Sequence, residues 1–146
     1  VNNKRISNDS KTYAYDDFTI PFSQPLQWLK DYIRDHIRSE YNFTLIDKSQ
    51  HGNIYNPKEK SFIRHQVDPV DLRNSPDYTL VYGTFVGKDS CELVIEYDDN
   101  RRKYRTWHIP IQNNYFYMFP STQRYFITEN KSKQMNVLLT INYEFI

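Results

Sequence analysis

Residues 53–68 of this 146-residue chain read NIYNPKEKSFIRHQVD, and they contain the features on which the fold prediction depends. The tripeptide Asn56-Pro57-Lys58 indicates a turn, and a strand is predicted after it over residues 62–67. His65 lies within that predicted strand, and Asp68 follows three residues later. Such a histidine is either a packed or surface side chain or a metal ligand, and the flanking sequence bears on that choice.

One helix is predicted before this stretch. Apolar residues recur there at the spacing of one helix face, and Pro25 suits the first turn of a helix. The apolar positions are Leu26, Leu29, Ile33 and Ile37. We predict a helix over residues 25–39 that packs on a sheet. Residues 1–17 are polar and lack periodicity, which predicts a flexible N-terminal arm before one domain over residues 18–146.

The remaining chain favours strands. It is 16% aromatic, with 13 Tyr and 9 Phe, and Ala14 is its only alanine; aromatic residues favour strands, whereas alanine is the best helix former. Strands separated by short turns indicate a sandwich or barrel. The predicted strands cover residues 43–46, 62–67, 78–86, 91–97, 105–111, 115–119, 124–128 and 136–145.

The charge and the cysteine content of the chain argue against several classes of protein. The net charge is +1, so no global field draws the chain to nucleic acid or to a membrane. Cys91 is the only cysteine, which excludes an intrachain disulfide and favours a reducing compartment. No segment reaches transmembrane length, and the first residues do not form a signal peptide. The bias toward Asn, Lys, Tyr, Phe and Ile suggests AT-rich coding, as in many viruses, so we expect a cytoplasmic or virion protein.

Several short motifs follow one another along the chain in an order that one enzyme family also has. Asn53-Ile54-Tyr55 is followed ten residues after its tyrosine by His65, and this spacing resembles the Asn-x-Tyr and His-x-Asp motifs of the 2-oxoglutarate/Fe(II) dioxygenases, AlkB-like branch. Gly83 resembles the end of that family's Ser-Leu-Gly strand. MFPSTQ at residues 118–123 resembles the segment before the distal histidine, and NVLLTIN at residues 136–142 resembles the closing Arg-x-x-x-Thr-x-Arg strand.

The resemblance implies a fold and a ligand set. It sharpens the predicted fold class to a mainly β (α+β) domain, a double-stranded β-helix (jelly-roll-like) with one N-terminal helix packed on the sheet. For an active member it implies Fe(II) and 2-oxoglutarate, with His65 and Asp68 as metal ligands. Asn53, Tyr55 and Asn136 would then lie at the co-substrate.

The chain departs from the family at the positions that carry the chemistry. Val67 rather than aspartate stands two residues after His65, and Thr128 stands near the position of the distal histidine. Asn136 and Asn142 stand where the family has arginines, one of which clamps a 2-oxoglutarate carboxylate. An amide cannot replace that cation.

Three functions are weighed on this basis. The first is a catalytically degenerate oxygenase-like domain with no catalytic residue and no cofactor. It would be a binding or structural module, such as a virion component, with a protein partner or self-association and no membrane contact. The second is an active 2-oxoglutarate/Fe(II) oxygenase, a hydroxylase or demethylase with a rearranged metal site. The third is a nucleic-acid binder that uses Arg101, Arg102 and Lys103 beside aromatic residues; a solvated hairpin tip is the alternative for those cations.

Overall fold

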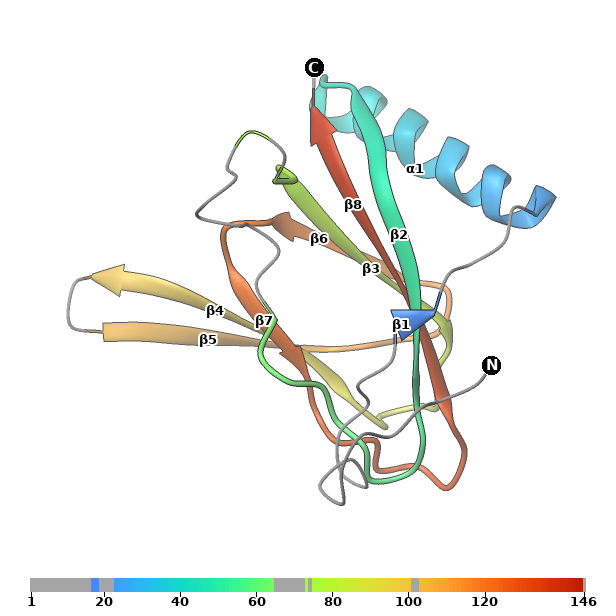
Figure 1. Cartoon of the computed structure of the whole chain (residues 1–146), viewed down its shortest axis with the longest axis vertical. Helices are drawn as coiled ribbons and strands as arrows, with labels where there is room; N and C mark the ends of the chain where they lie inside the picture. Colours follow the sequence, from blue (N-terminus) through green and yellow to red (C-terminus); the bar gives the residue numbers. More distant parts are fainter. Residues whose placement is uncertain (1–16, 19–22, 65–72, 74, 101–102, 146) are drawn as a thin grey trace.

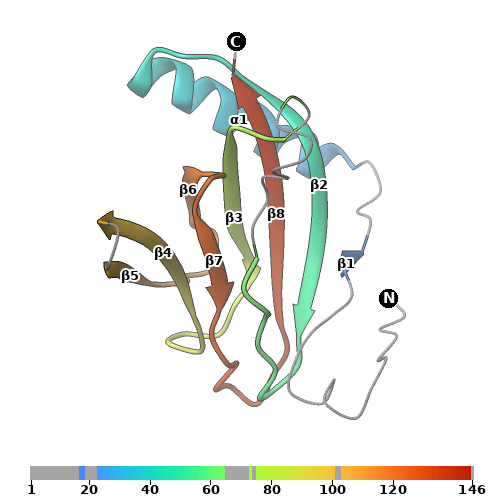
Figure 2. The same cartoon turned by 60° about the vertical axis from the view of Figure 1, so that its left-hand side comes forward.

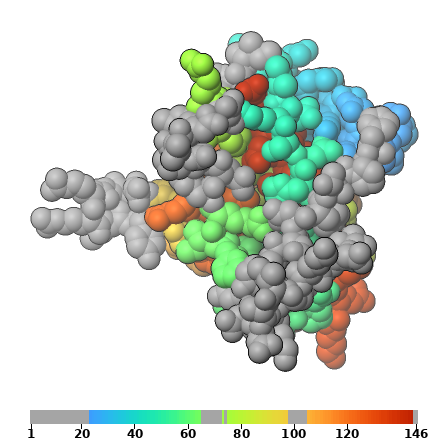
Figure 3. Space-filling model, viewed as in Figure 1, coloured from blue at the N-terminus to red at the C-terminus, as the bar shows by residue number. Residues whose placement is uncertain are grey.

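The protein has three layers in a computed structural model that describes residues 17–18, 23–64, 73, 75–100 and 103–145. One helix covers a five-stranded sheet, and a three-stranded sheet covers that sheet's other face (Figures 1 and 2). The space-filling view places the helix, in blue, on the side away from the smaller sheet (Figure 3). The predicted flexible arm lies outside the described residues except for Asp17.

All strands within the described residues pair antiparallel. The larger sheet has the order β1-β2-β8-β3-β6, and the smaller sheet has the order β5-β4-β7. The strands are β1 (Asp17–Phe18), β2 (Leu45–Tyr55), β3 (Tyr78–Phe85), β4 (Glu92–Asn100), β5 (Lys103–Pro110), β6 (Phe116–Pro120), β7 (Arg124–Ile127) and β8 (Asn136–Phe145). The prediction of a mainly β, jelly-roll-like domain with one helix on the sheet is confirmed.

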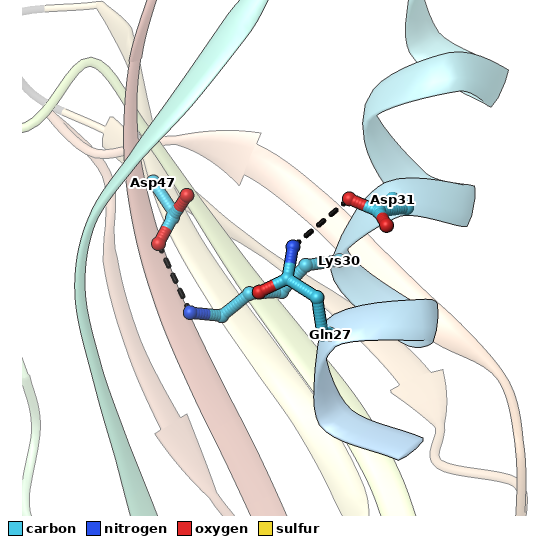
Figure 4. A network of polar contacts seen from close by, with 4 residues as sticks. All are labelled: Gln27, Lys30, Asp31 and Asp47. Carbon is cyan, nitrogen blue, oxygen red and sulfur yellow. Dashed lines mark hydrogen bonds and ion pairs between the residues drawn. The ribbon is translucent and has the colours of Figure 1, made fainter. Parts of the chain in front are cut away.

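Helix α1 (Gln24–Tyr41) lies where the apolar spacing predicted it. The Ser23 hydroxyl caps its start by accepting a hydrogen bond from the Leu26 N–H, and Asn42 ends it in the left-handed conformation, as a C-terminal cap requires. The ammonium of Lys30 reaches across to Asp47 on β2, with Nζ and Oδ2 3.0 Å apart (Figure 4). This ion pair joins the helix to the sheet beside the apolar contact. No helix within the described ranges is long and apolar enough to cross a membrane.

Strand β2 is much longer than the predicted strand over residues 43–46. It extends to Tyr55, so His51 lies within this strand. A bulge interrupts its pairing with β8 between Asp47 and Ser49. Leu45 and Asp47 contact the helix layer, whereas the Ser49 side chain bonds to Asn142 on the opposite face. The bulge therefore changes the face that odd-numbered residues present.

The predicted strand over residues 62–67 forms only in part. Arg64 and Tyr125 exchange two backbone hydrogen bonds beside β7, at 2.7 and 2.9 Å, and Ser61 N–H donates to Ile127 O. Residues 65–67 lie outside the described part of the chain. The described residues of this segment thus form a single β-bridge to β7 and not a regular strand.

Two apolar cores lie on the two faces of the larger sheet. The helix-side core includes Ile33, Leu80, Leu139 and Ile141, all buried. The core between the sheets includes Tyr55, Val81, Leu93, Ile95, Ile111, Phe119, Tyr125, Ile127 and Leu138. Adjacent residues of one strand thus enter different cores, as the alternation of strand side chains requires.

Gly83 marks a close approach of two backbone segments. A Cβ atom at this position would collide with the carbonyl oxygen of Gln112. The Gly83 N–H donates to Tyr115 O at 3.0 Å, and its carbonyl accepts from Asn114 N–H at 2.8 Å. This close approach gives a local reason for a glycine at position 83, where the oxygenase family has the end of its Ser-Leu-Gly strand.

Candidate functional site

The inner face of the larger sheet, which lies against the smaller sheet, holds buried polar side chains beside its apolar core. Thr79 is fully buried, and its hydroxyl donates to Asn142 Oδ1 at 3.0 Å. Because that donation uses its only proton, Thr79 accepts the 2.8 Å hydrogen bond from Ser121. Asn142 Nδ2 donates in turn to Ser49 Oγ at 3.1 Å. These four side chains, Thr79, Ser121, Asn142 and Ser49, form what we call the inner polar network.

The three predicted co-substrate residues lie near the other end of the same face. Tyr55 and Asn136 are directly opposite each other in the pairing of β2 with β8, and Asn53 is opposite Leu138. All three are buried. The amide of Asn136 is used within the fold: Nδ2 donates to Ser90 Oγ at 2.9 Å and to Cys91 Sγ at 3.5 Å, and Oδ1 accepts from Gly87 N–H at 3.1 Å.

Thr128, which stands near the position of the family's distal histidine, bonds to the protein backbone. Thr128 follows β7, and its hydroxyl accepts a 2.7 Å hydrogen bond from Glu92 N–H. Its own N–H donates to Glu92 O at 3.0 Å. Thr128 therefore continues the pairing of β4 with β7.

Other predicted site residues fall outside what the structure describes. His65 and Asp68, the expected metal ligands, are among them, as are Arg101 and Arg102. Lys103 begins β5, but its side chain is not described. Within the described ranges, no three His, Cys, Asp or Glu side chains lie close enough together to hold a metal ion.

Arg64 is an inner residue that the sequence did not single out. Because it is directly opposite Tyr125, which is in the core between the sheets, its side chain lies on the same inner face. It is half-buried. A single arginine before a predicted histidine gave no periodic signal that could have revealed this placement.

Fe(II) and 2-oxoglutarate need ligands that three described positions do not supply. The carboxylates of 2-oxoglutarate need a cation, yet Asn136 and Asn142 supply amides whose atoms already bond within the protein. Thr128 offers a hydroxyl where an imidazole would bind iron. At these three positions the residues do not fit the metal and the co-substrate of the family.

A cleft lies between the two sheets at the edge formed by β5 and β6, away from the β1 edge of the larger sheet. It has a volume of about 710 Å³ and lies between β5 of the smaller sheet and β6 of the larger sheet. Its walls include Ile95, Tyr97, Trp107, Ile109, Tyr117 and Phe119, and none of its lining residues is charged. We call it the β5–β6 cleft. The sequence did not reveal this cleft, because its walls come from two sheets whose packing could not be predicted.

Tyr117 is one of the residues that line this cleft. Its hydroxyl donates to Pro110 O and accepts from Gln112 N–H, both at 3.0 Å. Burial raises the pKa of the Tyr117 phenol, with the Gln112 hydrogen bond opposing that shift. Burial likewise raises the pKa of the Cys91 thiol, which keeps it protonated and unreactive at neutral pH.

Known structures resemble this arrangement, although no protein-family model matches the chain and no curated protein sequence matches it. An oxidoreductase of the 2OG-Fe(II) oxygenase family from Burkholderia pseudomallei superposes with a TM-score of 0.64 at 11% identity, over 86% of this chain and 57% of that one. A prolyl-4-hydroxylase from Pseudomonas putida gives 0.62 at 16% identity, over 86% and 68%. The viral collagen prolyl hydroxylase of Paramecium Bursaria Chlorella virus-1, in its 2OG complex, gives 0.56 at 11% identity, over 88% and 76%. The chain has the fold of the 2OG-Fe(II) oxygenases. At these identities the likeness concerns the oxygenase fold and not the activity.

Proposed function

We propose that this chain is a non-catalytic binding domain built on the oxygenase fold, with a protein partner or a second copy as its ligand. The observation that carries this proposal is the state of Asn142. Its amide bonds to Thr79 on one side and to Ser49 on the other. Both polar atoms of this side chain already bond within the protein, and neither carries the positive charge that a co-substrate carboxylate needs.

Two further positions support the same conclusion. Asn136 and Thr128 each satisfy a backbone N–H of the protein itself, at Gly87 and at Glu92. Buried polar groups are costly unless they are paired, so these hydrogen bonds account for the residues without any ligand. The finer predictions, an AlkB-like ancestry and a virion location, stay predictions.

One observation favours the alternative, a 2-oxoglutarate/Fe(II) oxygenase with a rearranged site. Arg64 places a guanidinium on the inner face next to the position of His65 in the sequence. Arginine is the side chain best suited to a carboxylate. Under this alternative His65 and Asp68 would hold the metal, and Arg64 would face the co-substrate.

Thermal unfolding with and without the cofactors separates the two functions. The full chain is melted alone and with millimolar Mn(II) plus 2-oxoglutarate, as wild type and as His65→Ala and Arg64→Gln variants. His108→Ala is the matched control, because it removes an exposed imidazole from β5. A ligand at 100 times its Kd stabilises the native state by about 2.7 kcal/mol, which is a shift of several degrees for a chain of this size.

The binding-domain proposal predicts equal melting temperatures with and without the two cofactors. A rise that His65→Ala and Arg64→Gln abolish, and that His108→Ala keeps, would overturn it in favour of the oxygenase. Binding to single-stranded nucleic acid, if weakened by salt and by Arg101→Ala and Arg102→Ala, would instead support the third function.

A further inference from the structure

Strand β5 forms an open edge of the smaller sheet. The sheet order is β5-β4-β7, and β4 is the only neighbour of β5 among the described strands. The β4–β5 hairpin projects away from the rest of the molecule, with β5 along its outer side (Figures 1 and 2). An edge strand presents backbone groups that can pair with another chain.

The direction of these backbone groups follows from two hydrogen bonds at the end of β5. Ile111 N–H donates to Cys91 O, so this odd-numbered residue points its N–H toward β4. Pro110 O instead accepts from the Tyr117 hydroxyl, which lies on the other side. Because backbone direction alternates along an antiparallel strand, Thr106 and His108 point their N–H and C=O groups away from β4.

The side chains of the same strand border the β5–β6 cleft. Trp107 is directly opposite Ile95, and Ile109 is opposite Leu93, and both partners belong to the core between the sheets. Trp107 therefore lies on the inner face, yet it is 61% exposed because no described strand flanks β5 there. Tyr117 and Phe119 of β6 form the facing wall.

We propose that the β5 edge and the β5–β6 cleft together bind an extended peptide segment of a partner protein by strand addition. This inference rests on the proposed binding function and names its site. A strand added beside β5 would bond to Thr106 and His108, and every second side chain would enter the cleft between Trp107 and Phe119.

The lining of the cleft specifies the chemistry of that segment. Its walls are aromatic and aliphatic and carry no charge, so a buried charge there would be unpaired and costly. The partner segment would therefore have apolar residues at alternate positions, where its side chains enter the cleft, and no charged residue among them.

Four variants test the proposal on the full chain. Thr106→Pro removes the outward N–H, a change that an edge strand tolerates because proline is accepted there. Thr106→Val is its control, since it keeps the N–H and removes only the hydroxyl. Trp107→Ala removes a wall of the cleft, and Trp28→Ala is its control, because Trp28 is 64% exposed and lies on helix α1.

The probe is a randomised nine-residue peptide library selected on the wild-type protein, followed by affinity measurement with the selected synthetic peptides. We expect peptides with alternating apolar residues, bound at least tenfold more weakly by Thr106→Pro and Trp107→Ala and equally by both controls. Amide hydrogen exchange on binding should slow at Thr106 and His108. The Trp107 N–H, directed toward β4, should change little.

Three outcomes would overturn the proposal. The first is that no peptide is selected, and the second is that the selected peptides bind Thr106→Pro and Trp107→Ala as tightly as wild type. The third is a dimer, in sedimentation without peptide, that Thr106→Pro dissociates, because β5 would then pair with a second copy. None of these outcomes produces a cofactor-dependent melting shift, so failure of this inference is distinguishable from failure of the binding-domain proposal.

Discussion

The two faces of the five-stranded sheet differ although they are made by the same strands. On β8, Leu139, Ile141 and Tyr143 lie toward the helix, whereas Thr140 and Asn142 lie toward the smaller sheet with Leu138. The helix face is thus closed by apolar packing. The inner face keeps buried hydroxyls and amides, which an interior needs only where they bond to each other or to a ligand. The two faces therefore draw their stability from different contacts: apolar packing on the helix side, and an apolar core with paired polar groups on the inner side.

The largest expected effect lies on the helix face. Leu80→Ala removes a fully buried side chain from the centre of the sheet, and the cavity should lower the free energy of unfolding by about 3 kcal/mol. Urea unfolding monitored by tryptophan fluorescence measures it. Phe85→Ala, on the same strand but exposed, is the control and should cost less than about 1 kcal/mol. A loss below about 1 kcal/mol at Leu80 would mean that the helix does not close this face.

The next largest loss of stability is expected when the inner polar network is broken. Asn142→Leu removes the acceptor of the Thr79 hydroxyl and the donor to Ser49 Oγ, and we expect a loss of about 2 kcal/mol in unfolding free energy. The double change Thr79→Val with Asn142→Leu should cost less than the sum of the two single changes, because it removes both members of a buried pair. Additive single effects in this double-mutant cycle would show that the network contributes nothing as a unit.

The same contrast explains which elements the sequence could predict. Helix α1 and strands β3 and β8 have apolar residues at regular spacing, and the prediction matched their positions to within a few residues. Strand β2 was predicted only in its first residues. Its inner positions are Ser49, His51 and Asn53, so apolar alternation is absent, and the bulge before Ser49 shifts the phase as well.

The candidate site was predictable only as a set of positions. The resemblance to the oxygenases implied that Asn53, Tyr55 and Asn136 lie near one another, and they do lie on neighbouring strands. The partners of Asn136 could not be inferred, because Gly87 and Ser90 reach it only through the folded connection after β3. Arg64 and the β5–β6 cleft were missed for the same reason, since both depend on contacts between distant segments.

A smaller effect concerns the polar atom at the helix face. The Tyr143 hydroxyl is buried and has no hydrogen-bond partner among the described residues. Burial, and then the charge of Asp47, raises the pKa of this phenol above its ordinary value. Below pH 10 the phenol is neutral in both states. Above pH 10 it ionises first in the unfolded chain, so its contribution to stability is lost as the pH rises.

Tyr143→Phe should remove that loss. We expect the difference in unfolding free energy between the variant and the wild type to grow by about 1 kcal/mol from pH 9 to pH 11, in favour of the variant. Tyr41→Phe, an exposed tyrosine on α1, is the control and should show no such growth. A constant difference across this pH range would mean that the phenol has access to water.

The smallest effect is expected at the edge of the helix face, where Lys30 pairs with Asp47. The Lys30 side chain is mostly buried, but Asp47 is about half exposed, so water screens the pair. Lys30→Met keeps the aliphatic stem and should cost only about 0.5 kcal/mol at low salt. The cost should fall toward zero in 1 M NaCl, whereas Lys133→Met, at an exposed position, should show neither effect. A cost above about 2 kcal/mol that persists in 1 M NaCl would mean that this charge is desolvated, and that the helix face, like the inner face, depends on a buried polar contact.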